Sequence, residues 1–288
     1  MGKTKPQAFS MHAVMDWARA ALRPSCHALI TPQAVVLDAG GSMRPALRQC
    51  VSSSGSLEER FGEAVAALLQ LIDDSGLRGR RLRVVVSDFW ARPLVLPLMG
   101  KRNSDEEMES LLQRQYHATY GDMMNDWHWC WEERGARLLA VAWPTAGINA
   151  LRDGLRQRSC VLASARPLAI DVASKALNDG GSTWLAIIEQ QSVTLVRQQT
   201  GAWEDWRVIP AAADRSESLP LLLAREVVRR GDGCRALTLV DLTGTANVTL
   251  LRSTLTESGW SMRVVSLTEA RTSLACRLTR SVLQAGVA

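Results

Sequence analysis

The sequence has little of several features that would assign it to a common protein class. Phenylalanine and tyrosine are scarce, with 3 Phe and 2 Tyr among 288 residues, although 10 residues are Trp. The 6 cysteines include no CxxC pair, so the spacing of zinc ribbons and thioredoxin-like sites is missing and free thiols are expected. No apolar run approaches the ~20 residues of a spanning helix, and the first residues lack the apolar segment of a signal peptide. We therefore expect a cytoplasmic protein without a transmembrane segment of its own.

Catalytic signatures are also missing. The patterns GxSxG, HExxH, SxxK and GxxxxGK[ST] do not occur, which removes the usual marks of serine hydrolases, zinc proteases, penicillin-binding proteins and P-loop enzymes. The charged residues do not indicate a class of partner either. The 34 Lys and Arg against 29 Asp and Glu leave a net charge of +5 that is spread along the chain, whereas phosphate binding calls for clustered positive charge. We expect no nucleic-acid partner.

What is present is the composition of a folded α/β protein. Apolar residues make up 47% and charged residues 22% of the chain, and this length favours one large domain or a few packed subdomains. Short β-rich runs alternate with segments of helical period. The expected helices are residues 11–22, 57–74, 105–116, 146–157, 167–177, 219–230, 246–258 and a terminal helix from 269; the expected strands are 34–38, 43–52, 82–87, 125–132, 137–143, 159–163, 183–189, 192–198, 203–209, 236–242 and 262–267.

Two helix starts carry strong local signals. Ser56 precedes the helix at 57–74 and is followed three residues later by Glu59, which is the pattern of a capping box. Ser104 precedes the helix at 105–116, whose first turn is acidic as the helix dipole favours. These two signals predict where the helices before and after the strand at 82–87 begin.

The order of elements repeats, because a hairpin or meander opens each half and leads into helices. Together with the glycine turn in Val36-Leu-Asp-Ala-Gly-Gly-Ser42, the segment Asp171-Val-Ala-Ser-Lys-Ala-Leu177 and an inserted block from about residue 86 to 165, this order resembles the actin-like ATPase superfamily. Within it, the resemblance is to PilM-like pilus assembly proteins and the cytoplasmic part of GspL-like secretion proteins. It covers nearly the whole chain.

The resemblance implies an α/β fold of two ribonuclease-H-like halves with a small inserted α/β subdomain. On this basis the chain divides into four parts. They are a preamble helix at 1–30, a first actin-like subdomain at 31–85 plus 166–180, the inserted subdomain at 86–165, and a second actin-like subdomain at 181–288.

The resemblance also implies where a nucleotide would lie. Asp38 corresponds to the acid on the magnesium side, and Gly40, Gly41 and Ser42 correspond to the phosphate contacts of the first turn. The second turn departs from the family pattern, since Glu189, Gln191 and Thr194 stand where an Asp, a Gly and a Thr are usual. Gly244 is the single glycine at the adenosine turn. A Gln side chain at the position of close approach would obstruct phosphate, so ATP with Mg is in doubt and no cofactor is expected.

A tryptophan stripe is the second feature. In a strand, Trp127, Trp129 and Trp131 share one face while His128 and Cys130 share the other. The stripe either packs against helices of the inserted block or binds a partner, because Trp is common at interface hot spots. His128 and Cys130, with His117 nearby, fall short of the four ligands that structural zinc needs, so no metal is expected.

From the resemblance we expect a non-catalytic or weakly nucleotide-binding scaffold of a type IV pilus or type II secretion-like assembly. It would bind a short cytoplasmic segment of a bitopic inner-membrane protein and lie at the periphery of the inner membrane. Two alternatives remain. One is an active Mg-ATP-binding ATPase of the actin-like group. The other is a metal-dependent ribonuclease-H-like nuclease, for which Asp38, Asp88 and Asp241 follow strands.

Overall fold

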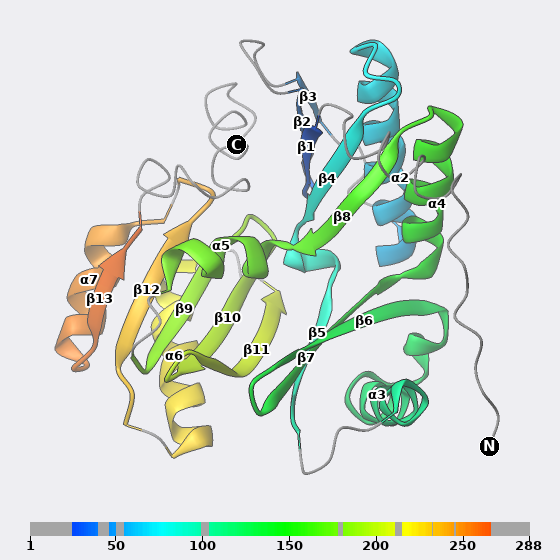
Figure 1. Cartoon of the computed structure of the whole chain (residues 1–288). Coiled ribbons are helices and arrows are strands. Elements are labelled where there is room, and N and C mark those ends of the chain that lie inside the picture. Colours follow the sequence, from blue (N-terminus) through cyan, green and yellow to red (C-terminus); the bar gives the residue numbers. More distant parts are fainter. Residues whose placement is uncertain are drawn as a thin grey trace, which may run out of the picture.

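A computed structural model describes residues 25–39, 46–49, 55–98, 104–177, 181–210, 215–231, 233–244 and 246–265. The helices expected at 11–22 and from 269 lie outside these residues. Among the described residues, no helix combines the length and apolar character that crossing a membrane requires. The chain forms two larger sheets and one small sheet (Figure 1).

The first sheet has the strand order β3-β2-β1-β4-β8. Strands β1, β2 and β3 form an antiparallel meander, and β4 and β8 add in parallel on the other side. Their bounds are Ser25–Ile30 for β1, Ala34–Asp38 for β2, Ala46–Gln49 for β3, Arg81–Val86 for β4 and Val161–Pro167 for β8. Since β8 comes after the inserted block, the first half closes only when the chain returns from the insert.

Helices α2 (Leu57–Asp74) and α4 (Thr145–Gln157) lie side by side against this sheet (Figure 1). The capping box expected at Ser56 and Glu59 is present at the start of α2. The two helices approach closely at Gly147, where a Cβ atom would lie 2.2 Å from Phe61 Cδ1, and at Gly154, where it would lie 2.3 Å from Leu69 Cδ1. Only glycine permits this spacing between the helices.

The inserted block is a three-stranded antiparallel sheet of order β5-β7-β6, with α3 (Asp105–Tyr120) packed on one face. Its strands are β5 (Arg92–Pro97), β6 (Trp127–Arg134) and β7 (Arg137–Pro144), and short 3-10 turns η1 (Asp88–Trp90) and η2 (Gly121–Asp126) lead into β5 and β6. Two prolines place β5 at the edge, as their missing N–H groups require. This edge lies against the second half.

The second half repeats the architecture of the first. Its sheet has the order β11-β10-β9-β12-β13, with three antiparallel strands followed by two parallel ones. The strands are β9 (Thr183–Ile188), β10 (Ser192–Gln199), β11 (Ala202–Pro210), β12 (Ala236–Asp241) and β13 (Ser261–Val264), and the helices are α6 (Arg215–Arg230) and α7 (Val248–Glu257). Helix α5 (Leu168–Ala176) follows β8 and lies at the junction of the halves (Figure 1).

One hydrophobic core runs across this junction. It joins first-sheet residues to Leu185 and Ile187 of β9 and to Trp203 and Trp206 of β11. Separate clusters fill the space under α6 and α7 and between α3 and the small sheet. The halves are therefore packed against one another through apolar contacts as well as polar ones.

The structure differs most clearly from the sequence expectations at β1 and β8. Residues 25–30 were expected in a preamble but form β1, the middle strand of the first sheet. The strand expected at 159–163 is β8, displaced to 161–167, and it pairs with β4 rather than with the insert. Of the strand expected at 43–52, residues 46–49 are described as β3. β1 is a central strand, and in a central strand apolar and polar residues do not alternate. The two-residue period that identifies a strand in a sequence is therefore missing.

Candidate functional site

The first turn of the expected nucleotide site is described only in part. Asp38 ends β2 and is half-buried, while Gly40, Gly41 and Ser42 lie outside the described residues. The phosphate contacts expected from these three residues therefore stay a prediction.

The second turn is the β9–β10 hairpin, and its acid, Glu189, is buried at the boundary between the halves. Its carboxylate accepts a hydrogen bond from the Ser192 hydroxyl at 3.3 Å, and from the first half it accepts bonds from the Ser87 hydroxyl and the Asp88 N–H. Burial raises the pKa of Glu189 to about 7, although these three hydrogen bonds favour the charged form. Glu189 thus holds the second half to the start of η1.

Asp88 is the acidic residue of the first half that lies at this contact. Its Oδ2 accepts the N–H of Ala169 at 2.9 Å, so it caps helix α5, whose own N-cap residue, Pro167, offers no side-chain bond. Burial and the nearby Glu189 raise the pKa of Asp88 well above its usual range. The Thr194 hydroxyl favours the charged form of Asp88 and so acts to lower its pKa. Within the described part of the chain, however, neither this hydroxyl nor Asp88 Oδ1 has a hydrogen bond of normal geometry.

We call Ser87, Asp88, Glu189, Ser192 and Thr194 the inter-half cluster. All five are buried, and they come from the end of β4 and from the β9–β10 hairpin. Sequence analysis singled out Glu189 and Thr194 for a nucleotide and Asp88 only as one acid of a nuclease. The structure brings these side chains together, with their hydrogen bonds directed at one another and at backbone groups.

A second polar contact joins the halves beside this cluster. Arg60 of α2 donates from Nη2 to Oε1 of Gln191 at 2.6 Å, and its guanidinium lies 5.0 Å from the centre of the Phe89 ring. Gln191 occupies the position at which the family pattern has glycine. Its side chain is therefore bound to the opposite half of the protein.

The turn after β12 is organised by Asp241. Its carboxylate accepts the N–H groups of Thr243 at 2.8 Å, Gly244 at 3.2 Å and Ala246 at 3.1 Å. Gly244 has a φ of +67°, which favours glycine. The N–H of Gly244 thus bonds within its own turn.

No metal centre is formed by the described residues, where no group of three or more His, Cys, Asp or Glu side chains is arranged to hold an ion. Asp88 and Asp241 have the separate roles given above, and Asp38 does not join them. The combination of His128, Cys130 and His117 likewise makes no such group.

The tryptophan stripe faces α3. Trp127 is buried with Met108 and Leu112, and Trp129 and Trp131 are half-buried against the same cluster. The Trp129 ring stacks on Tyr116 with centroids 5.8 Å apart. The packing interpretation of the stripe accounts for these contacts, and partner binding by these three residues stays a prediction.

A cavity of about 240 Å³ lies where the insert, the first half and β11 meet. We call it the junction cavity. Its lining comes from β6, β7, β8, α5 and β11, and includes Trp131, Trp143, Arg134, Arg166, Ile170 and Trp206. Arg134 pairs with Glu132 at 3.1 Å, whereas Arg166 is exposed and forms no ion pair with a described residue. This site was not expected, since nothing local in the sequence brings Trp143 and Trp206 together.

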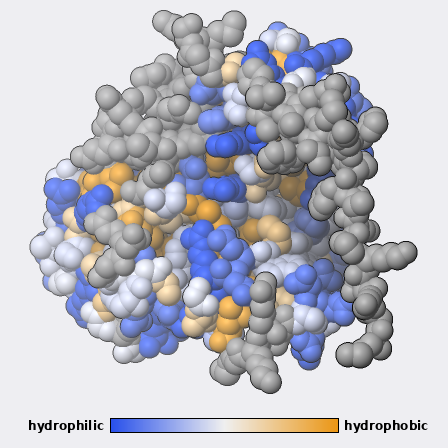
Figure 2. Space-filling model, viewed as in Figure 1, coloured by the Kyte–Doolittle hydropathy of each residue, from blue (hydrophilic) through white to orange (hydrophobic). Residues whose placement is uncertain are grey.

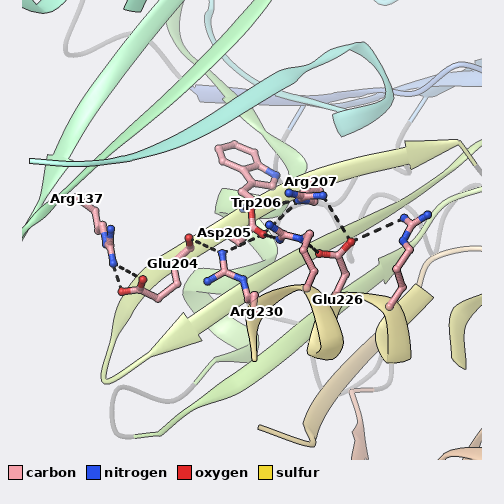
Figure 3. A network of polar contacts seen from close by, with 9 residues as sticks. Arg137, Glu204, Asp205, Trp206, Arg207, Glu226 and Arg230 are labelled. Atoms are coloured by element: carbon pink, nitrogen blue, oxygen red, sulfur yellow. Dashed lines mark hydrogen bonds and ion pairs between the residues drawn. The ribbon is translucent and has the colours of Figure 1, made fainter. Parts of the chain in front are cut away.

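The β11 side of this region is held by ion pairs, drawn in Figure 3. Arg137 of β7 pairs with Glu204, which fastens the insert to β11. The neighbouring Asp205 accepts from Arg230 at 3.0 Å and from Arg207 at 3.2 Å. Burial acts to raise the pKa of Asp205, but the hydrogen bond from Arg230 and the adjacent arginine charges outweigh it and lower the pKa. The network fixes β11 against α6.

Solved structures with similar coordinates share one fold. A Bacteroides thetaiotaomicron protein with an actin-like ATPase fold and unknown function has a TM-score of 0.60 at 9% identity, covering 93% of this chain and 98% of that chain. The PilM-PilN type IV pilus biogenesis complex gives 0.59 at 13% identity, with 92% and 99% covered. The cytoplasmic domain of EpsL, an inner-membrane component of the type II secretion system of Vibrio cholerae, gives 0.50 at 13%, with 90% and 94% covered.

No protein-family model matches the sequence, and a search of curated proteins gives no match. The similarity in structure confirms the expected fold: the chain is an actin-like α/β protein with two similar halves and an inserted subdomain.

Proposed function

We propose that this protein is a non-catalytic scaffold of a type IV pilus or type II secretion-like assembly, and that it binds a short cytoplasmic segment of a bitopic inner-membrane protein. The junction cavity carries this proposal. The fold shared with the PilM of a PilM-PilN complex and with the cytoplasmic domain of EpsL supports this setting, at the inner face of the inner membrane.

The junction cavity has the features of a peptide site. Two of its lining residues, Trp143 and Trp206, are large aromatic side chains, and aromatic residues are common in sites that bind peptides. β8, which contributes Ala165 and Arg166, is an edge strand of the first sheet, and edge strands accept extended peptides.

The residues of the cavity also suggest the chemistry of the segment. Ile170 and the tryptophans provide apolar walls, and Arg166 provides a positive charge at the rim. An extended segment with a bulky apolar residue followed by an acidic one suits this arrangement. Trp131 lines the same cavity, whereas Trp127 and Trp129 are occupied by their contacts with α3.

The polar groups near the expected nucleotide site support a function without ATP. Gln191 is hydrogen-bonded to Arg60 where a phosphate-binding turn needs a bare backbone. Glu189 is buried with its carboxylate engaged by Ser87 and Ser192, and Asp241 takes the N–H of Gly244. These described residues do not fit a Mg-nucleotide, so no step of the proposed function uses one.

Site-specific photocrosslinking tests the binding site. A photoreactive residue at Ile170, in the full chain produced in its native cells, is expected to crosslink to the cytoplasmic segment of a single-pass inner-membrane protein. The same residue at Arg156, exposed on α4, serves as the control and is expected to give no such product. Failure of Ile170 to capture any inner-membrane protein would refute the proposed function.

Mg-ATP distinguishes the scaffold from an ATPase. A ligand that binds only the native state must raise the melting temperature, so an ATPase would be stabilised by millimolar Mg-ATP. We expect no shift. A metal-dependent nuclease would instead show DNA or RNA cleavage that is lost in Asp38→Ala, and we expect no cleavage by the native protein.

A further inference from the structure

The outer face of α6 exposes apolar side chains beside positive charge. Leu221 and Val228 are 73% and 81% exposed, which makes them the most exposed large apolar side chains among the described residues. They are seven residues apart and therefore lie on one face of the helix, with Ala224 and Arg225 between them. All four of these residues are exposed.

Over the part of α6 whose side chains the structure describes, this face carries apolar and basic groups. Over residues 219–230, the single acid is Glu226, which is buried and paired with Arg229 at 2.7 Å. Arg225 and Arg229 keep 65% and 40% of their side chains exposed. The opposite face of the helix, with Leu219 and Leu223, is buried in the second half.

The charges of the described residues around α6 do not cancel. Among these residues, four arginines, including Arg207 and Arg230, contact two carboxylates, those of Asp205 and Glu226 (Figure 3). Two positive charges are therefore left over, and they border the exposed apolar residues. Since both acids lie beneath the arginines, the outermost charges are positive.

We propose that this face of α6 binds the surface of a membrane containing anionic lipids. A helical segment that has aliphatic and arginine side chains on its outer face and no exposed acid, as residues 219–230 do, suits the boundary between headgroups and acyl chains. Leu221 and Val228 enter the apolar layer, and Arg225 and Arg229 contact lipid phosphates. This contact would hold the scaffold at the membrane independently of any peptide in the junction cavity.

The remaining exposed large apolar residue of the described part of the chain lacks this combination. Leu250 on α7 is 46% exposed, but Ser253 and Glu257, three and seven residues on, share its side of the helix and are exposed. On the face drawn in Figure 2, hydrophobic residues occur in small areas separated by hydrophilic ones. Leu250 therefore supplies an apolar control that has an acid instead of arginine beside it.

Vesicle co-sedimentation of the purified full chain tests the proposal. Binding to vesicles rich in phosphatidylglycerol should exceed binding to phosphatidylcholine vesicles and should weaken as salt rises. Arg225→Gln should weaken binding about fivefold, and Leu221→Ser with Val228→Ser should weaken it about tenfold or more. Leu250→Ser and Arg156→Gln should bind as the native protein does, and circular dichroism should confirm that each variant is folded.

Equal binding to both vesicle types, or unchanged binding by the Leu221 and Val228 double variant, would overturn the proposal. A photoreactive residue at Val228 that labels a protein rather than lipid in native cells would also overturn it, by assigning the face to a protein partner. The vesicles contain no protein, so this result is independent of the crosslinking at Ile170.

Discussion

The guanidinium of Arg60 and the side-chain oxygen of Gln191 are 2.6 Å apart, although 131 residues separate them in the chain. One comes from the helix of the first half and the other from the hairpin that opens the second. In proteins that bind phosphate at such a hairpin, the turn must present its backbone N–H groups. In this protein the side chain of Gln191 occupies the turn and is hydrogen-bonded to Arg60 of the other half.

A double-mutant cycle measures this contact. Arg60→Ala, Gln191→Ala and the combined variant should give a coupling energy of about 1 kcal/mol in urea unfolding, as expected for a partly buried hydrogen bond with a charged donor. The exposed pair Arg156 and Asp153 is the control and should couple by less than about 0.5 kcal/mol. Equal coupling in the two cycles would contradict a bond that joins the halves.

The close approach of α2 and α4 predicts opposite effects for two similar substitutions. Gly147→Ala should destabilise the fold by about 1–3 kcal/mol, because the new methyl group would overlap Phe61. Gly62→Ala, also within a helix but with nothing within 4 Å of the added atom, should stabilise it by about 0.5–1 kcal/mol. Chemical denaturation measures both, and a stabilising Gly147→Ala would show that the helices can separate freely.

Glu189 predicts a pH dependence with a definite sign. Its pKa is about 7 in the folded protein against an ordinary value of 4.5, so between these values the folded state holds a proton that the unfolded state has released. Stability from this group therefore falls as pH rises from about 4.5 to 7. The raised pKa of Asp88 acts in the same direction.

Glu189→Gln removes this titration. The melting temperature of the variant relative to the native protein should therefore rise between pH 4.5 and 7.5, since each pKa unit corresponds to about 1.4 kcal/mol. Glu132→Gln, at an exposed ion pair, is the control for the loss of an acidic side chain. A pH-independent difference between Glu189→Gln and the native protein would place the titration elsewhere.

Asp205 predicts the opposite pH behaviour. Its lowered pKa means that its contribution to stability is present above the unfolded-state pKa and is lost as pH falls through the folded-state value. Asp205→Asn should cost about 2–3 kcal/mol at pH 7, because three arginines lose their partly buried partner. The cost should shrink in acid, and unfolding at pH 7 and pH 3 measures both values.

The sequence predicted the elements that depend on local signals. The capping boxes at Ser56 and Ser104 mark the starts of α2 and α3 where expected, and the repeated order of elements led to the correct fold. Strand β1 was missed because Cys26 to Ile30 is a short apolar run next to Pro24, and such a run fits a buried strand or a helix segment equally well.

The site could not be predicted from local sequence signals, because its contacts join residues that are far apart in the chain. Asp88 caps α5 across 81 residues, and the residue preceding that helix is Pro167, which gives no sign of a carboxylate. Gln191 was noticed in the sequence as a departure from the family pattern at the second turn, but its partner on α2, Arg60, carries no local signal. The junction cavity likewise depends on the meeting of three sheets.

The junction cavity has a consequence for biosynthesis. Its walls are made by residues between Cys130 and Trp206, so they emerge from the ribosome over a long stretch of translation, with the last wall supplied by β11. A nascent or truncated chain that ends within the insert has the tryptophans of β6 and β7 but no cavity between them. A membrane partner that binds in this cavity would therefore bind only chains in which both halves have been synthesised and packed together.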